Sequence, residues 1–221
     1  MRWLALLLVV TLAAPGLPPS AAAAGPGHEI TTSVDATFAA RARALQQKGW
    51  TFEQVFAELC RTVLANTQQH PELRLDDQAR AMFGGLWLWA CHGGAPAFQG
   101  QRDKALHFIA GGVFQGYWDA GRPAGVLKEE MDRRDPHNFF DLDDLAATLM
   151  GSRWVDLATG EDRSASRRWV EGWAQGRYSL SRSLPKLEFG HLATGRDAST
   201  EQIKAVRQAV QAGMPPPDDP R

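Results

Sequence analysis

Three nearby segments carry the side chains that are best suited to acid–base chemistry or metal binding. They read Asp103-Lys-Ala-Leu-His107, Lys128-Glu129-Glu-Met-Asp132 and Asp141-Leu-Asp-Asp144. An imidazole beside several carboxylates can form a general acid–base pair, and the same groups supply nitrogen and oxygen ligands to a metal ion. Lys104 and Lys128 stand in the same segments and can act as counter-charges. The stretch 103–144 is therefore the candidate site.

The first segment belongs to a predicted helix over about 103–118. Its apolar face recurs at i, i+3 and i+4 and consists of Leu106, Ile109, Ala110, Val113, Phe114 and Tyr117. Asp103 and His107 are four residues apart, so they lie one above the other at the edge of this face. A buried polar group without a partner costs ~1–3 kcal/mol. We therefore expect partners for both residues from the next two helices.

The second segment belongs to a predicted helix from Pro123 to about 134, which Asp135-Pro136 ends. Its apolar line is Ala124, Leu127 and Met131. Glu129 and Asp132 lie on a different face, which periodicity alone predicts to be solvated. Lys128 can pair with Asp132 at i+4, an interaction worth only a few tenths of a kcal/mol when it is exposed.

The third segment begins another predicted helix. Asp141 is a good N-cap residue and Asp144 falls at the third helical position, so both carboxylates could simply serve the free N–H groups of the first turn. Asp144 lies nearer the packed side of this helix, which carries Leu145 and Leu149.

Taken together, the segments resemble the YfiM-like family of small exported bacterial proteins. The resemblance covers about 100–152 and rests on Asp103-Lys-x-x-His107-Phe, a Gly/Ala-rich helix, Lys128-Glu129-x-x-Asp132, and an Asp144-Leu-Ala segment that ends in Gly151. That family is mostly lipoproteins and has no firmly assigned activity. This chain lacks a lipobox cysteine, so the resemblance does not imply a membrane tether here, and it has a long N-terminal helical region that small members lack.

Two interpretations of the cluster are open. In the first, Asp103, His107, Glu129, Asp132 and Asp144 form a buried salt-bridge network with the two lysines that fixes helix packing. In the second, His107, Glu129 and Asp132 are catalytic, and Asp103 and Asp144 are metal ligands. Oxygen ligands would dominate such a site, which favours Ca²⁺, Mg²⁺ or Mn²⁺ if a metal binds. Both interpretations predict that the five side chains gather around one point.

Composition narrows the class of protein. The 221 residues are 44% hydrophobic and 22% charged with a net charge of −1, which suits one globular domain and removes the electrostatic case for nucleic acid or an anionic membrane as the main partner. Signatures such as Gly-x-Ser-x-Gly, a Walker loop or His-Glu-x-x-His are absent from the sequence. We expect a non-catalytic binding or structural protein with a cell-envelope component as partner. The alternative is a metal-assisted hydrolase that acts on an envelope polymer or phosphoester.

The N-terminus predicts export. Arg2 precedes an apolar run over 3–14, and Ala22 and Ala24 satisfy the A-x-A rule, so residues 1–24 are interpreted as a signal peptide with cleavage before Gly25. The run is shorter than the ~20 residues that span a bilayer, which disfavours an uncleaved anchor. We expect a periplasmic or secreted protein without a transmembrane segment in the mature chain. A single domain is expected over 25–213, with a disordered tail over 214–221.

The rest of the sequence predicts an all-α fold, an irregular bundle of about six to eight helices. Further helices are expected from about 33 to 47, from Thr51 with a capping box, over 76–90, over 164–176 and from 199 to about 212. Gly111, Gly112 and Gly116 are expected to permit close contact between helices. Cys60 and Cys91 are the only cysteines, and in an exported chain we expect them to form a disulfide, with two buried free thiols as the alternative.

Overall fold

The computed structural model describes residues 26–91, 102–133, 140–180 and 198–217. Within these ranges the chain is all-α, with eight helices and no strand. The helices are α2 (Pro26–Gln47), α3 (Phe52–Gln69), α4 (Leu75–Cys91), α5 (Arg102–Trp118), α6 (Gly121–Arg133), α7 (Leu142–Ala158), α8 (Arg163–Ala174) and α10 (Thr200–Gly213). The all-α prediction is confirmed. The predicted signal peptide lies outside the described residues.

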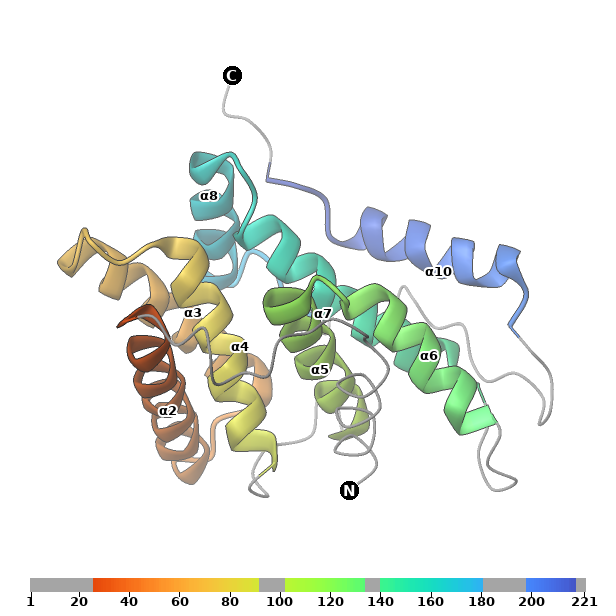
Figure 1. Ribbon diagram of the computed structural model, residues 1–221, viewed down its shortest axis with the longest axis horizontal. Coiled ribbons are helices and arrows are strands. Elements are labelled where there is room, and N and C mark those ends of the chain that lie inside the picture. Colours follow the sequence, from red (N-terminus) through yellow and green to blue (C-terminus); the bar gives the residue numbers. More distant parts are fainter. Residues whose placement is uncertain (1–25, 92–101, 134–139, 181–197, 218–221) are drawn as a thin grey trace.

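Figure 1 shows how the helices are arranged. Helices α2, α3 and α4 lie together on the left of the view, α5, α6 and α7 occupy the centre and right, and α10 runs across the top right. The closest packing in the molecule is between α5 and α7, and α6 contacts both of them. The three helices that carry the candidate site are therefore mutual neighbours, as their short connections predicted.

Local sequence signals set several helix starts. Thr51 accepts from the backbone N–H of Gln54 while the Gln54 side chain accepts from the N–H of Thr51, which is the predicted capping box. Asp141 is the N-cap of α7 and accepts from the N–H groups of Asp143 and Asp144. Helix α8 begins at Arg163, one residue before the predicted start, and Asp162 is its N-cap.

Phe56 on α3 lies at the centre of the hydrophobic core. Its ring centroid is 5.3 Å from that of Phe108 on α5, 5.4 Å from Trp154 on α7, 5.4 Å from Trp173 on α8 and 6.0 Å from Phe83 on α4. All five side chains are buried. This one aromatic group therefore connects five helices, and edge-to-face pairs of this kind add about 0.5–1.5 kcal/mol each beyond the area that they bury.

Two glycines let α5 and α7 approach closely enough for their backbones to touch. A Cβ atom at Gly111 would overlap the carbonyl oxygen of Thr148, and a Cβ at Gly151 would overlap the carbonyl oxygen of Phe108. Gly151 does not end its helix as the sequence indicated, since α7 continues to Ala158. Each glycine costs about 1 kcal/mol of helix propensity relative to alanine. The close contact between α5 and α7 requires glycine at both positions in spite of this cost.

Helix α6 is oriented differently from the prediction. Leu127 and Met131 are exposed, whereas Glu129 has no exposed surface. The reason is a stripe of residues four apart, Gly121, Gly125 and Glu129, which faces α7. A Cβ at Gly121 would overlap the Ser152 hydroxyl, so this stripe packs too closely for larger side chains. Periodicity assigns the apolar line to the core, but contact with α7 decides the orientation here.

The predicted disulfide is wrong, because both cysteines are free. Cys60 is fully buried in the middle of α3, and Cys91 is exposed at the last position of α4. Packing of α3 and α4 places Cys60 in the core and Cys91 at the surface, so the two sulfur atoms do not form a disulfide. Burial raises the pKa of the Cys60 thiol far above its ordinary range, which makes it unreactive.

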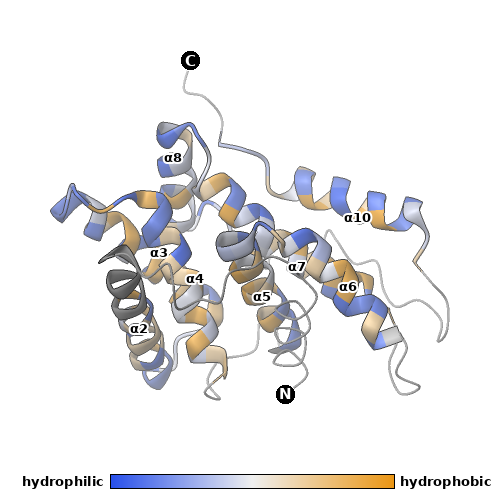
Figure 2. Cartoon of the chain, in the orientation of Figure 1, coloured by the Kyte–Doolittle hydropathy of each residue, from blue (hydrophilic) through white to orange (hydrophobic). Residues whose placement is uncertain are grey.

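The C-terminal helix docks on α7. Figure 2 shows the hydrophobic residues of α10 along the edge that is turned toward the rest of the molecule, where Val206 and Val210 are buried. Met214 was expected in a disordered tail, but its side chain is buried and its carbonyl oxygen accepts from Nε of Arg153 at 2.8 Å. Within the described residues, no helix is long and apolar enough to cross a membrane.

Candidate functional site

The side chains of seven charged or titratable residues from α5, α6 and the start of α7 meet between these helices. They are Lys104, His107, Lys128, Glu129, Asp132, Asp141 and Asp144, here called the charge cluster. Helix α5 supplies two members, α6 supplies three, and the N-cap and first turn of α7 supply the last two. Five of the seven are buried, and Lys128 and Asp132 are only partly exposed.

His107 lies at the centre of the cluster and contacts all three helices. Its Nδ1 is 3.2 Å from the Thr148 hydroxyl, which in turn donates to the carbonyl oxygen of Asp144 at 3.0 Å. The hydroxyl proton is used in that bond, so Oγ1 of Thr148 accepts from Nδ1–H. The other ring nitrogen, Nε2, is 3.1 Å from Oδ2 of Asp144 and 3.1 Å from Nζ of Lys128. A neutral imidazole accepts from Lys128 there, and a protonated one donates to Asp144.

Lys128 joins the acidic members of the cluster. Its ammonium lies 2.8 Å from Glu129, 2.8 Å from Asp132 and 3.6 Å from Asp144. The pair with Asp132 confirms the predicted i+4 contact, but the lysine side chain is only 14% exposed. The pair therefore stands in a less screened environment than a surface ion pair.

A second lysine closes the other side of the cluster. Nζ of Lys104 is 2.5 Å from Oδ1 of Asp144 and 3.2 Å from Oδ2 of Asp141. Asp141 thus combines two roles, since its other oxygen caps α7. The backbone N–H of Asp141 donates to Oε2 of Glu129 at 3.0 Å. Glu129 consequently ties α6 to the start of α7 through Oε2, while its Oε1 pairs with Lys128 on α6 itself.

Burial and neighbouring charges displace the pKa values in opposite directions. Burial raises the pKa of Glu129 to about 7, with Asp144 adding to this rise and Lys128 opposing it. Burial lowers the pKa of His107, and the two lysines lower it further against the attraction of Asp144. Burial would raise the pKa of Asp144, but His107 and Lys104 outweigh it and hold this pKa well below the usual range. Separated values of this kind are typical of a dense, buried network.

The structure brings together most, though not all, of the predicted site residues. Ligand atoms of His107, Glu129 and Asp144 lie within 4.8 Å of one another. Asp132 joins them through Lys128. Asp103 does not belong to this group, because its side chain is exposed and its carboxylate accepts from the backbone N–H of Lys104. The prediction that five side chains gather around one point is therefore wrong for Asp103.

Two members of the arrangement were not recognised from the sequence. Thr148 fixes the orientation of the His107 ring, and its only signal is its position four residues after Asp144 on the same helix. Asp141 was recognised as an N-cap but not as a partner of Lys104. Its capping role explained it sufficiently, so nothing in the sequence indicated a second contact.

A metal ion would compete with a cation that the chain already provides. Nζ of Lys128 lies within 3.6 Å of ligand atoms of His107, Glu129 and Asp144, the three residues that could hold an ion. Carboxylate oxygens and an imidazole nitrogen suit Mn²⁺ or Mg²⁺ in type. The ammonium, however, satisfies the same atoms by charge-assisted hydrogen bonds.

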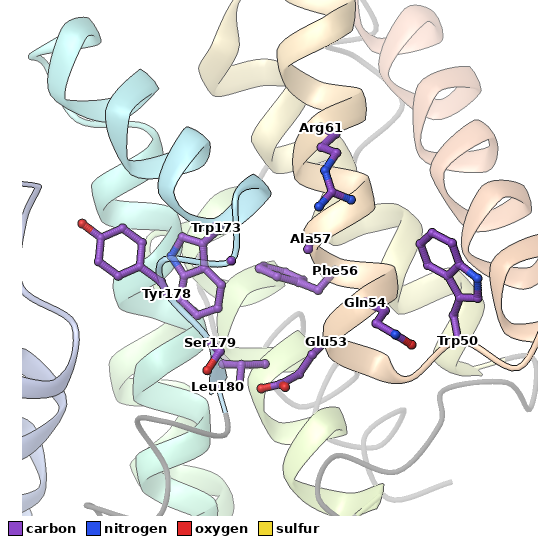
Figure 3. Close-up of a pocket in the computed structure, with 11 residues that line it drawn as sticks. Trp50, Glu53, Gln54, Phe56, Ala57, Arg61, Trp173, Tyr178, Ser179 and Leu180 are labelled. Carbon is purple, nitrogen blue, oxygen red and sulfur yellow. The ribbon is translucent and has the colours of Figure 1, made fainter.

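Four pockets of the described residues lie away from the charge cluster. One of about 520 Å³ lies between the N-terminal half of α3 and the residues that follow α8 (Figure 3). Phe56 and Trp173 form its floor, and Arg61 and Glu53 bring one charge of each sign to it (Figure 3). Four pockets of the described part, this aromatic pocket among them, contain no member of the charge cluster in their lining.

Comparison with family models, with curated proteins and with solved structures finds no match to this chain. The resemblance to the YfiM-like family over 100–152 therefore stays a prediction from the sequence motifs.

Proposed function

We propose that this protein is an exported helical protein of the bacterial cell envelope, similar to the YfiM-like family, with a non-catalytic binding or structural role. In this proposal the charge cluster holds α5, α6 and α7 in one arrangement and performs no reaction. Residues 1–24 are the export signal, and the partner is a component of the envelope.

One observation carries the non-catalytic part of the proposal. The Lys128 ammonium contacts the imidazole and the carboxylates of Glu129, Asp132 and Asp144 at 2.8–3.6 Å, so the acidic groups of α6 and α7 already have a cation between them. A catalytic acid or base must reach a substrate, but His107 is 4% exposed and Glu129 is 0% exposed. A closed, lysine-paired network supports a structural role.

The binding part of the proposal is supported by the aromatic pocket. Trp50, Trp173 and Tyr178 contribute rings to it, and Arg61 and Gln54 contribute hydrogen-bonding groups. Pockets with an apolar lining and a few polar groups are the usual places where proteins hold ligands. This pocket is therefore the first place to look for contacts with an envelope component.

Lys128→Met is the decisive variant for the cluster. We expect it to lower the free energy of unfolding by about 3 kcal/mol, because it leaves buried carboxylates without their cation. Urea denaturation of the mature protein measures this loss. Lys204→Met, at an exposed lysine 3.9 Å from Glu201 on α10, is the control and should change stability by less than about 0.5 kcal/mol. A loss as small as that of the control would contradict a structural role.

The second candidate is a metal-assisted hydrolase of an envelope polymer or phosphoester, with His107 as acid or base and Glu129, Asp132 and Asp144 as ligands or partners. The close approach of three ligand atoms favours it. Calorimetric titration of the wild-type protein with Mn²⁺ distinguishes the two. Our proposal predicts no binding tighter than about 1 mM, the weak end for extracellular calcium modules. Tight stoichiometric binding that His107→Gln abolishes would instead establish a metal site at the cluster and favour the hydrolase.

Export is tested separately by cell fractionation and by mass spectrometry of the purified protein. The proposal predicts a periplasmic or secreted product whose first residue is Gly25. An intact chain that begins at Met1 and stays in the cytoplasm would rule out the envelope assignment without affecting the argument about the cluster.

A further inference from the structure

A small pocket with three arginines lies where α10 docks against α6 and α7. It has a volume of about 120 Å³ and is lined by Arg122, Leu149, Arg153, Arg207, Val210 and Gln211. None of these six residues carries a negative charge. The aliphatic floor of Leu149 and Val210 is buried, so the guanidinium groups stand around an apolar base. The pocket belongs neither to the charge cluster nor to the aromatic pocket.

The local charge is not balanced by the described residues. Arg122 is paired with Asp156 at 2.5 Å. Within the described part of the chain, no carboxylate lies within ion-pair distance of Arg153 or Arg207, which leaves two guanidinium groups in excess. Burial lowers the pKa of Arg153, and the nearby Arg122 lowers it further, while Asp156 opposes both. Arg153 is half-buried, whereas Arg122 and Arg207 are exposed, and like charges gathered around one pocket favour an anion between them.

Arg153 is held in place for such a role. Its Nε donates to the carbonyl oxygen of Met214 at 2.8 Å, just after the last turn of α10. A guanidinium has five N–H donors, so this bond fixes the plane of the group and leaves the Nη donors. Arg207 reaches the pocket from α10 and Arg122 from α6. Arginines from three helices thus line one space, and planar guanidinium groups are well suited to bind phosphate oxygens.

We propose that this arginine pocket binds a phosphate-type oxyanion, either a free phosphate or phosphorylated small molecule or the headgroup of an anionic phospholipid. The volume of about 120 Å³ is several times the ~30 Å³ that one water molecule occupies. It therefore fits one tetrahedral oxyanion with part of its hydration shell.

The test is calorimetric titration of the mature protein with inorganic phosphate at low ionic strength. We expect saturable binding at one site that weakens as salt is added. Arg207→Gln should weaken it about tenfold, the effect of losing one hydrogen bond to a charged group. Arg43→Gln removes the same charge from an exposed position on α2 and should leave the affinity within about twofold. Absence of saturable heat in the wild type, or equal affinity in wild type and Arg207→Gln, overturns the proposal.

Vesicle sedimentation identifies the source of the phosphate group. A lipid headgroup is supported if the protein binds vesicles with phosphatidylglycerol but not vesicles of phosphatidylcholine alone. Arg207→Gln should then reduce this binding, and Arg43→Gln should not. Phosphate binding without sedimentation supports a free phosphate or a phosphorylated small molecule. Sedimentation that both variants reduce equally reflects overall charge, and it overturns the assignment to this pocket.

Discussion

Glu129 offers the sharpest test of the charge cluster, because its carboxyl group should make stability depend on pH. The pKa of this group is raised from 4.5 to about 7 in the folded protein by burial. Between these two values the folded protein holds a proton that the unfolded chain has lost. Stability therefore falls as the pH rises through this range. At 1.36 kcal/mol for each pH unit, the contribution of Glu129 amounts to roughly 3 kcal/mol.

The variant Glu129→Gln removes this titration and keeps the shape of the side chain. The amide cannot replace both acceptor contacts, with Lys128 and with the N–H of Asp141, so a constant loss of about 1–3 kcal/mol is expected at every pH. In addition to this constant loss, the free energy of unfolding of the variant should rise relative to that of the wild type by roughly 3 kcal/mol between pH 4.5 and pH 7. The difference should then level off.

The assay is urea denaturation of both proteins at intervals from pH 4 to pH 8, with helicity followed by circular dichroism. His107 acts in the opposite direction, because its pKa is lowered from 6.5 and stability is lost as the pH falls below that value. It is present in both proteins, so the part of its titration that does not depend on Glu129 cancels in the comparison. Glu201→Gln, at a side chain that is 81% exposed, is the control and should run parallel to the wild type.

Parallel curves for Glu129→Gln and the wild type would refute the reasoning. They would mean that Glu129 ionises at the same pH in the folded and unfolded chains, so that water or Lys128 compensates its burial completely. A difference that changes in the opposite direction would mean that the ion pair with Lys128 outweighs burial and lowers this pKa.

The remaining predictions concern packing and thiol chemistry. His107→Ala should destabilise the protein by about 2–3 kcal/mol in thermal or urea unfolding, because it leaves a cavity and removes a polar partner from Thr148. Gly111→Ala should cost several kcal/mol, since its Cβ would overlap a backbone oxygen of α7. Gly116→Ala should be close to neutral, because its Cβ would meet the flexible side chain of Arg80 at 3.3 Å and Val155 at an ordinary contact distance of 3.6 Å. Equal effects of the two substitutions would contradict the packing of α5 against α7. A thiol reagent should modify Cys91 in the folded protein and Cys60 only after unfolding, and fewer than two thiols in denaturant without reductant would contradict the free cysteines.

Helix positions were largely determined by local sequence. The capping box at Thr51, the N-cap at Asp141 and the breaks at Gly49 and His70-Pro71 each act within a few residues, so they can be read without knowing the fold. The apolar face of α5 likewise predicted the burial of Ile109. The pairing of Lys128 with Asp132 follows from helical geometry alone.

The membership of the charge cluster was decided by tertiary structure. Periodicity assigned Glu129 to solvent and Leu127 to the core, and the reverse is observed, because Gly121 and Gly125 let α6 lie against α7 on its acidic side. Asp103 and His107 share a helix edge in sequence, but the orientation of α5 leaves Asp103 outside and His107 inside. The rotation of a helix about its own axis depends on the surfaces of all the helices that it contacts. The periodicity of one segment describes only the surface of that helix itself.

The two cysteines also show what local sequence determines and what depends on tertiary structure. The sequence determined that the chain has two cysteines and an N-terminus that predicts export, and in an exported chain a disulfide would be chemically permitted. Whether they pair depends on how α3 and α4 are offset along their axes, and the packing around Phe56 places Cys60 in the core while Cys91 ends its helix at the surface. Bond formation needs two sulfur atoms in contact, and only the relative placement of the two helices, which no local signal encodes, decides that distance.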